Sequence, residues 1–259
     1  MTIEETLRET LKRAREERLK KLILSSNHVP RHVAIIMDGN RRFAQQLGLD
    51  PVEGYKRGKE KLEEVLSWCQ ELGIRVLTVY AFSMENFRRR PEEVKAILAL
   101  IKEGLEELAE EERVYKYKVR VCVLGQRNLL PPDVKEVAER IEKLTEGHDQ
   151  YFFNIAIAYG GREEIITAIK RICTDCIEGK ISPEDIDEET VTQYLYTKGM
   201  PDPDLILRTS GEERISNFLL WQLAYSELYF ADVYWPRLTK LDFLRAIRSY
   251  QLRQRRFGK

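Results

Sequence analysis

Short apolar runs alternate with longer amphipathic segments along the chain from residue 29 onward. This alternation is typical of a mostly parallel β-sheet with helices on both faces, because strands buried on both sides are nearly continuous runs of Val, Ile and Leu. Six runs have the length and composition of strands. They are Val33–Met37, Val76–Phe82, Val119–Leu124, Phe153–Tyr159, Leu205–Thr209 and Leu228–Val233.

The segments between these runs have apolar residues at helical spacing. The clearest are residues 55–71, which end just before Gly73, and residues 91–112, which begin at a proline. Two further helices are predicted, at 132–144 and from 161 to near 179. No Gly-, Pro- or Ser-rich linker and no repeat of fixed period interrupts the pattern. The sequence therefore predicts a single α/β domain with a six-stranded sheet.

Residues 1–26 precede the first predicted strand and have a pattern of their own. They contain seven Lys or Arg and five Glu, and their apolar stripe consists of Ile3, Leu7, Leu11, Ala14 and Leu22. This spacing predicts an amphipathic helical extension at 1–26, followed by the main domain at 27–259. Two roles stay open for the extension. It is either a solvated helix packed on the domain or a surface that rests on anionic lipid.

Composition and charge exclude several classes of protein. The chain has 259 residues, is 43% hydrophobic, and has 43 basic against 43 acidic side chains. An intrinsically disordered chain would be less apolar, and a nucleic-acid-binding protein usually has a basic excess. The apolar runs are too short to span a bilayer, and the N-terminus lacks the pattern of a secretory signal. We therefore expect a cytoplasmic protein that does not bind nucleic acid, with its four cysteines as free thiols.

Polar residues follow several of the predicted strands directly. In an open parallel sheet, ligands bind beyond the carboxyl ends of the strands, so these residues are the candidates for a binding site. Glycine lets the backbone approach an anion, and arginine offers a fork of donors to phosphate oxygens. The pattern predicts a phosphorylated ligand, with Asp38 as a magnesium ligand because a carboxylate tolerates phosphate only across a cation. The segments are 38–42, 83–86, 160–162 and 210–214.

Four long motifs resemble the cis-prenyltransferase family, which includes undecaprenyl and dehydrodolichyl diphosphate synthases. The resemblance covers nearly everything after Asn27. The motifs are HVAIIMDGNRR at 32–42, YAFSMENFRR at 80–89, AYGGR at 158–162 and ILRTSGEERISNFLLWQ at 206–222. The resemblance implies that the chain adds isopentenyl diphosphate units to an allylic diphosphate primer, either farnesyl or geranylgeranyl diphosphate, with cis double bonds. The product would be a long polyprenyl diphosphate for a glycosyl carrier lipid, and the implied cofactor is Mg²⁺.

The resemblance also implies roles for individual residues. Asp38 matches the essential aspartate and, with Glu227, positions associated with the metal. Asn86 matches a catalytic position, although a carboxamide has no useful basicity and its role should be to position a substrate by hydrogen bonding. Glu93 matches a position near the substrate. The residues implied in substrate binding are Gly39, Asn40, Arg41, Arg42, Phe43, Ser83, Met84, Glu85, Phe87, Arg89, Arg208, Arg214, Ile215 and Ser216.

The C-terminal residues Arg256-Phe257-Gly258 resemble the Arg-x-Gly ending of the family. In the family this ending reaches the diphosphate site of a partner subunit, so the resemblance implies a homodimer. Peripheral contact with a membrane is a further expectation. The chain departs from many bacterial members at Pro51 and Tyr55, where they have an arginine and a histidine, and Arg41 resembles the eukaryotic and archaeal form.

Two other functions remain as alternatives. The first is a non-catalytic subunit that supports another prenyltransferase, although the presence of Asp38, Arg208 and the Arg-x-Gly ending together argues against it. The second is a nucleotide-dependent phosphotransferase on a doubly wound sheet. The chain contains neither a Gly-x-x-x-x-Gly-Lys-Ser/Thr run nor a Gly-x-Gly-x-x-Gly run, which argues against this second alternative.

Overall fold

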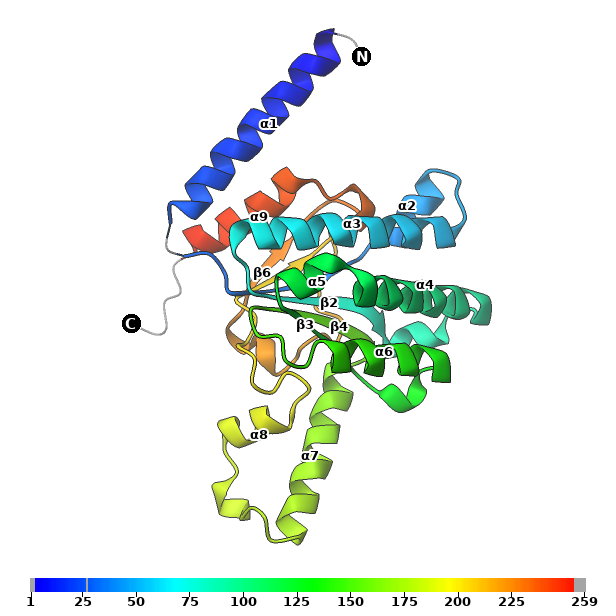
Figure 1. The fold of residues 1–259 in the computed structure, drawn as a ribbon, viewed down its shortest axis with the longest axis vertical. Helices are drawn as coiled ribbons and strands as arrows, with labels where there is room; N and C mark the ends of the chain where they lie inside the picture. Colours follow the sequence, from blue (N-terminus) through cyan, green and yellow to red (C-terminus); the bar gives the residue numbers. More distant parts are fainter. Residues whose placement is uncertain (1–2, 27, 254–259) are drawn as a thin grey trace. The chain divides into compact units, whose positions relative to one another are not determined.

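The computed structural model describes residues 3–26 and 28–253 (Figure 1). The strands are β1 (His32–Ile36), β2 (Val76–Ser83), β3 (Val119–Leu124), β4 (Tyr151–Tyr159), β5 (Leu205–Arg208) and β6 (Glu227–Phe230). They form one six-stranded sheet in the order β3-β4-β2-β1-β5-β6. The pairs β1–β5, β5–β6 and β3–β4 are parallel. The predicted α/β fold with a six-stranded sheet is confirmed.

Contacts within the chain group into two compact units, which we describe separately. The first unit comprises residues 1–77, 204–213 and 227–259, and the second comprises 78–203 and 214–226. Helices of the first unit are α1 (Ile3–Leu24), α2 (Asn40–Gln46), α3 (Pro51–Leu72), the 3-10 turn η5 (Trp235–Arg237) and α9 (Lys240–Leu252). Those of the second are η1 (Met84–Arg88), α4 (Pro91–Glu110), α5 (Glu112–Lys116), η2 (Arg127–Leu129), α6 (Pro132–Leu144), α7 (Gly161–Ile177), η3 (Pro183–Asp185), α8 (Glu188–Tyr194) and η4 (Gln222–Tyr225).

Helix α1 is attached to the first unit through its C-terminal part only. Ile23 is fully buried, and the Lys20 ammonium lies 2.6 Å from the Glu71 carboxylate of α3. Glu71 also binds Lys240 of α9, at 2.7 Å. Toward the N-terminus, Leu7 and Leu11 of the predicted apolar stripe are 58% and 49% exposed, and this end of α1 extends away from α3 and α9 (Figure 1). The C-terminal part of α1 thus packs on α3 and α9, and the choice between the two roles of residues 1–26 stays open.

Two glycines of α3 create the space into which α2 packs. A Cβ atom on Gly54 would lie 2.2 Å from the backbone oxygen of Asn40, and one on Gly58 would lie 2.5 Å from the Asn40 Oδ1 atom. The carbonyl oxygen of Gly58 also accepts a hydrogen bond of 2.8 Å from the Trp235 indole. These contacts explain why the helix contains glycine at positions where alanine would favour helix formation.

We expect Gly54→Ala to destabilise the protein, although alanine is intrinsically the better helix former. The new methyl group would meet backbone atoms of Asn40, so α2 would have to move away from α3. Overpacking of this kind costs about 1–3 kcal/mol of unfolding free energy, which denaturant titration measures. Gly147→Ala is the matched control, because a Cβ at Gly147 meets no atom within 4 Å. Equal stability of the two variants would contradict the proposed role of Gly54.

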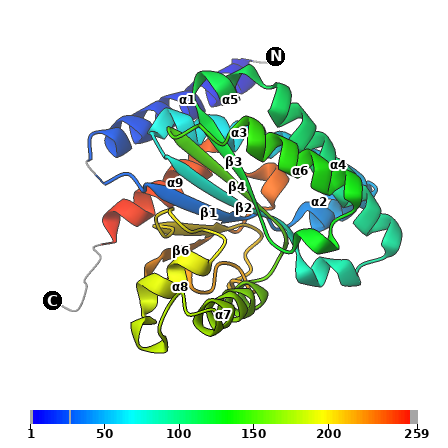
Figure 2. The same cartoon turned by 60° about the horizontal axis from the view of Figure 1, so that its bottom comes forward.

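In the second unit, α4 packs beside α6, and α7 packs beside α8 (Figure 2). The core of this unit includes a buried polar cluster around Glu164, which is 1% exposed. Its carboxylate accepts hydrogen bonds from the Tyr159 hydroxyl at 2.5 Å, the Tyr196 amide at 2.8 Å and the Gln222 side chain at 3.1 Å. Burial raises the pKa of Glu164, in spite of these donors. The cluster joins α7, β4 and η4.

None of the helices within residues 3–26 and 28–253 is both long enough and apolar enough to cross a lipid bilayer. The longest of them, α1 and α3, have 22 residues each, and charged side chains recur along both.

Candidate functional site

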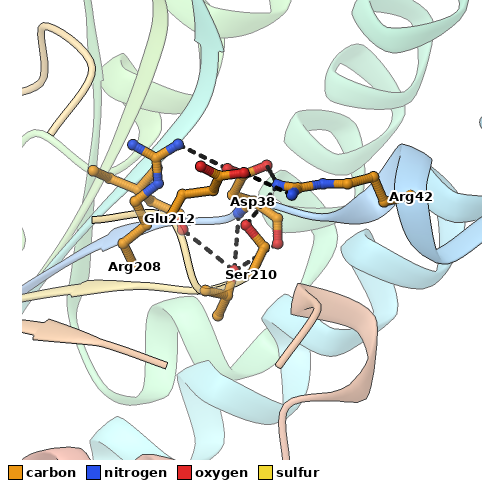
Figure 3. A network of polar contacts seen from close by, with 7 residues as sticks. Asp38, Arg42, Arg208, Ser210 and Glu212 are labelled. Carbon is orange, nitrogen blue, oxygen red and sulfur yellow. Dashed lines mark hydrogen bonds and ion pairs between the residues drawn. The ribbon is translucent and has the colours of Figure 1, made fainter. Parts of the chain in front are cut away.

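The parallel pairing of β1 with β5 brings Asp38 and Arg208 together. Ile36 is level with Arg208 in the register, and Asp38 follows two residues after Ile36. The Arg208 guanidinium donates a hydrogen bond from Nη2 to Asp38 Oδ2 at 2.8 Å (Figure 3). The Arg208 side chain is 4% exposed and that of Asp38 is 28% exposed. Asp38, which follows β1, and Arg208, which ends β5, therefore meet at the carboxyl ends of two neighbouring strands.

Helix α2 adds a second arginine to the pair. Arg42 lies one helical turn after Asp38, and its Nη2 atom is 3.3 Å from Asp38 Oδ1. The same Nη2 donates to the Ser210 hydroxyl at 2.7 Å, and Nη1 donates to Glu212 Oε1 at 2.7 Å. Figure 3 shows the resulting cluster of two carboxylates and two guanidinium groups, in which Glu212 and Ser210 come from the loop after β5. This cluster is called the Asp38 cluster below.

The backbone at Asp38 is fixed by Thr209, whose side chain is fully buried. The Asp38 amide donates to Thr209 Oγ1 at 2.9 Å, and the Thr209 hydroxyl donates to the Asp38 carbonyl at 2.6 Å. Thr209 was not among the predicted site residues, and Ser210 and Glu212 were predicted only as members of the segment 210–214. Their signal in the sequence was their position, since they closely follow a predicted strand and its arginine.

The charges of the Asp38 cluster keep its carboxylate ionised. Burial raises the pKa of Asp38, but the hydrogen bond and the charge of Arg208, together with Ser210 and Arg42, outweigh burial and hold the pKa below its ordinary value. Burial also lowers the pKa of Arg42, whereas Glu212 and Asp38 raise it by a larger amount. Asp38 therefore stays ionised at neutral pH, and the guanidinium groups of Arg42 and Arg208 are both oriented toward its carboxylate.

The other predicted residues of the first motif lie at the start of α2. Gly39 has a φ of 106° and precedes the helix, and a Cβ there would lie 2.8 Å from the Tyr234 ring. Arg41 is exposed. Phe43 is 6% exposed, and the guanidinium of Arg237 lies 5.4 Å from its ring centre. Phe43 is therefore a core residue of the first unit in this structure, although the resemblance implies contact with substrate.

In the second unit, the predicted residues 83–87 form the end of β2 and the turn η1. Asn86 and Ser83 make a capping box, in which the Ser83 amide donates to Asn86 Oδ1 at 3.0 Å. The carboxamide of Asn86 thus holds the turn in place, and its contact with a substrate stays a prediction. Glu85 is exposed, and Phe87 packs edge to face on Phe82 at 4.9 Å. Met84 begins the turn.

Arg89 follows η1 and forms an ion pair with Glu93 at 3.0 Å. Glu93 is 7% exposed, so this pair is partly buried. Arg214, Ile215 and Ser216 lie in the second segment of the second unit, where Arg214 and Ser216 are exposed. The Arg256-Phe257-Gly258 ending lies outside the described residues.

Glu227 does not share a metal site with Asp38 of the same chain. In the register of β5 and β6, Glu227 is level with Leu205, whereas Arg208 is level with Phe230. Because strands rise about 3.3 Å per residue, Glu227 and Asp38 are about 16 Å apart along the strand direction. The Glu227 carboxylate instead binds Arg253 Nη1 at 2.9 Å. The prediction of one site formed by both carboxylates is therefore wrong within one chain.

The turn at Gly160-Gly161-Arg162 was predicted to present its amides to a phosphate, but these amides are already occupied. The Gly161 amide donates to the Asn217 carbonyl at 2.7 Å, and the Arg162 amide donates to Asn217 Oδ1 at 2.9 Å. The first amides of α7 thus bind another part of the chain rather than a ligand.

The Asp38 cluster can hold a magnesium ion only together with a ligand. Within residues 3–26 and 28–253, no group of three or more His, Cys, Asp or Glu side chains could hold a metal ion by itself. In phosphate-binding sites, however, Mg²⁺ is commonly bound by one or two carboxylates, and substrate phosphates and water complete its shell. The ionised Asp38 carboxylate beside two arginines fits this second arrangement.

Comparisons with known proteins agree with this chemistry. Residues 36–258 match the family model described as "Putative undecaprenyl diphosphate synthase". A tritrans,polycis-undecaprenyl-diphosphate synthase (geranylgeranyl-diphosphate specific) from Thermococcus kodakarensis is 56% identical over 91% of this chain and 89% of its own length. An enzyme of the same name from Thermoplasma volcanium is 59% identical over 89% of each chain.

A solved structure is also similar. The crystal structure of lavandulyl diphosphate synthase from Lavandula x intermedia in complex with dimethylallyl diphosphate has a TM-score of 0.85. It is 36% identical in sequence and covers 89% of this chain and 99% of its own. The match to the family model covers most of the chain and includes every residue of the Asp38 cluster, so this chain is a transferase of prenyl groups that belongs to the undecaprenyl diphosphate synthase family of cis-prenyltransferases.

Proposed function

We propose that this enzyme extends geranylgeranyl diphosphate by repeated condensation with isopentenyl diphosphate, with cis double bonds, to give a long polyprenyl diphosphate. The Asp38 cluster is the observation that carries this proposal, because it sets two guanidinium groups and an ionised carboxylate side by side. The choice of primer rests on the relatives from Thermococcus and Thermoplasma, whose names state that they are geranylgeranyl-diphosphate specific. We further propose that the product serves as a glycosyl carrier lipid.

In the expected reaction, the bond between the allylic carbon and the diphosphate oxygen breaks, and its electron pair leaves with the diphosphate. The alkene of isopentenyl diphosphate forms the new carbon–carbon bond to the allylic carbon and then loses a proton, for which a diphosphate oxygen is the base. Stabilising the negative charge on the leaving group is the main task of the protein. A magnesium ion held by Asp38 would supply a Lewis acid for that charge.

Arg42 would supply hydrogen-bond donors for this task, whereas Arg208 would hold the diphosphate of isopentenyl diphosphate. A guanidinium group can bind two phosphate oxygens at once, which fixes the direction in which the diphosphate lies. Two of the Arg42 donors are used by Ser210 and Glu212. A diphosphate that takes the Nη1 donor of Arg42 would replace Glu212 and open the ion pair between these two residues.

Isopentenyl diphosphate is assigned to Arg208, Arg214, Ile215 and Ser216, and the primer to residues 39–43 and 83–89. When the protein holds both diphosphates, the alkene and the allylic carbon are already close together and oriented. Their reaction then behaves like a step within one molecule. The resemblance to the cis-prenyltransferases is the basis for proposing a homodimer in which the Arg256–Gly258 ending contacts the partner subunit. The sequence pattern is the basis for proposing a cytoplasmic location and peripheral contact with a membrane.

The proposed primer can be tested by competition. Labelled isopentenyl diphosphate and Mg²⁺ are incubated with equal concentrations of farnesyl and geranylgeranyl diphosphate, and the products are separated by chromatography. We expect chains that start from geranylgeranyl diphosphate to dominate, and we expect a chelator to stop the reaction. A majority of chains started from farnesyl diphosphate would overturn the choice of primer. Absence of elongation with every primer would overturn the function and would favour the non-catalytic alternative.

A further inference from the structure

The loop that contains Arg214, Ile215 and Ser216 has an unfavourable backbone conformation. Ser216, Asn217 and Leu219 have φ values of 49°, 64° and 45°, in the left-handed region that residues other than glycine rarely adopt. Each such residue is unfavourable and persists only where surrounding contacts impose it. The contacts that impose it here should therefore decide where the side chains of 214–216 are placed.

Asn217 makes most of these contacts. Its carbonyl oxygen accepts from the Gly161 amide at 2.7 Å, and its Oδ1 accepts from the Arg162 amide at 2.9 Å. Its Nδ2 donates to Glu163 Oε2 at 3.2 Å and to Glu85 Oε1 at 3.4 Å. The first three partners are in the opening turn of α7, and the last is in η1. Asn217 thus ties the 214–216 loop both to α7 and to the segment assigned to the primer.

The glycines before α7 leave room for this arrangement. A Cβ on Gly160 would lie 2.1 Å from Glu163 Oε2 and 2.8 Å from Asn217 Nδ2, and a Cβ on Gly161 would lie 2.7 Å from Leu220. Both glycines therefore let the loop after Arg214 approach the start of α7. This accounts for the Gly160-Gly161-Arg162 motif without a phosphate ligand.

The residue type at 217 fits all of these contacts. Asparagine tolerates the left-handed conformation better than most residues, and its carboxamide has both an acceptor and two donor hydrogens. Aspartate would keep the acceptor but would place a third carboxylate beside Glu163 and Glu85. Glycine would keep the backbone conformation but would lose every side-chain contact.

We propose that Asn217 is a positioning residue for isopentenyl diphosphate, which acts by holding the Arg214–Ser216 loop against α7 and η1. This assignment rests on the proposed function, because the loop is assigned to isopentenyl diphosphate there. Phe218 also holds the loop in place, because it is fully buried and its ring stacks on that of Tyr80, with the ring centres 4.6 Å apart. Loss of the Asn217 side chain should therefore loosen the loop without detaching it from the unit.

The test compares Asn217→Gly with the wild-type enzyme in steady-state kinetics and in equilibrium titration with isopentenyl diphosphate alone. We expect the KM and the Kd for isopentenyl diphosphate to rise about tenfold, while the KM for the allylic primer changes less than about twofold. A general loss of folded protein would lower the apparent kcat and leave both KM values unchanged. Asn128→Gly is the matched control, since Asn128 is an exposed residue of the same unit.

A second pair of variants tests the contact with Glu163. Asn217→Asp should bind isopentenyl diphosphate more weakly than Asn217→Gly, because of its charge. Adding Glu163→Gln should restore part of the binding, since the carboxamide introduced at position 163 could donate to the carboxylate introduced at position 217. If Asn217→Gly binds isopentenyl diphosphate as the wild type does, or if both KM values change equally, the role of Asn217 is overturned but the proposed function is not. A wild-type enzyme that neither binds nor condenses isopentenyl diphosphate would overturn the proposed function and the assignment with it.

Discussion

Replacing Asp38 by asparagine should lower kcat for chain elongation by about three orders of magnitude while the fold is retained. The new side chain has nearly the same shape and can still accept a hydrogen bond from Arg208, so the local structure should persist. The negative charge is lost, and with it the group that fits a magnesium ion. Loss of electrostatic stabilisation at a leaving group typically lowers the rate by a factor of about 10²–10³. A thousandfold decrease in kcat corresponds to about 4 kcal/mol of activation free energy.

The role of Asp38 can be separated from damage to the fold by a binding measurement. In the wild-type enzyme, Mg²⁺ should tighten the binding of the allylic primer, because the ion links the carboxylate to the diphosphate. In Asp38→Asn the same titration should give one affinity with and without Mg²⁺. Asp149→Asn removes an exposed carboxylate from the loop before β4 and should behave as the wild type. Full elongation activity in Asp38→Asn, or an unchanged response to Mg²⁺, would exclude Asp38 as the metal-binding group.

The six strands and the polar groups that follow them could be predicted from the sequence for the same physical reason. Buried parallel strands are continuous apolar runs, and the predicted ranges differ from the observed strands mainly at the ends. The longest shift is in β6, which was expected at 228–233 and is found at 227–230. Once the strands are known to be parallel and to lie side by side, the groups that follow them must meet. This reasoning singled out Asp38 and the segment 210–214, whereas Arg208, which binds Asp38, was implied by the family resemblance.

Helices α2 and α9 were not predicted, and the reasons differ. Helix α2 has seven residues, of which only Phe43 and Ala44 are buried, so it has no apolar stripe to detect. Helix α9 does have one, since Phe243, Leu244 and Ile247 are buried and Thr239 and Asp242 form a capping box at its start. That signal was present in the sequence, but no helix was assigned to it. Helix α3 was recognised, but its start was placed after Asp50 and Pro51, which cap it.

The misinterpreted parts of the site depend on contacts between distant residues. A Gly-Gly-Arg turn before a helix has the composition of an anion site, and only the position of Asn217, more than 50 residues later, shows that its amides are occupied. Likewise, Glu227 and Asp38 are both acidic residues next to strands, but Glu227 begins its strand whereas Asp38 follows the end of another. The predicted strand 228–233 already placed Glu227 at the amino end of a strand, but the resemblance grouped it with Asp38 by residue type.

Replacing Arg208 by glutamine should lower kcat/KM for isopentenyl diphosphate about a hundredfold or more and should also change its pH dependence. Arg208 is buried, and removing one partner of a buried charge pair costs about 2–5 kcal/mol of binding free energy. A loss of about 2.7 kcal/mol corresponds to a hundredfold decrease in kcat/KM. Arg42 is the natural comparison, because it is more exposed and only 3.3 Å from the other oxygen of Asp38. Arg42→Gln should therefore weaken binding of the allylic primer more than that of isopentenyl diphosphate.

The pH effect of Arg208→Gln has a definite sign. In the wild type the pKa of Asp38 is lowered, because Arg208 and its neighbours outweigh burial. The ion pair therefore stabilises the fold at every pH above the ordinary pKa of an aspartate, and this contribution is lost only as the pH falls through the lowered value. Without Arg208, burial remains and the main opposing cation is gone, so the pKa of Asp38 should rise. The acid limb of the kcat/KM profile should then move to higher pH in Arg208→Gln and should move less in Arg42→Gln. Superimposable acid limbs in all three enzymes would mean that Asp38 is not the group whose ionisation sets the acid limit of activity.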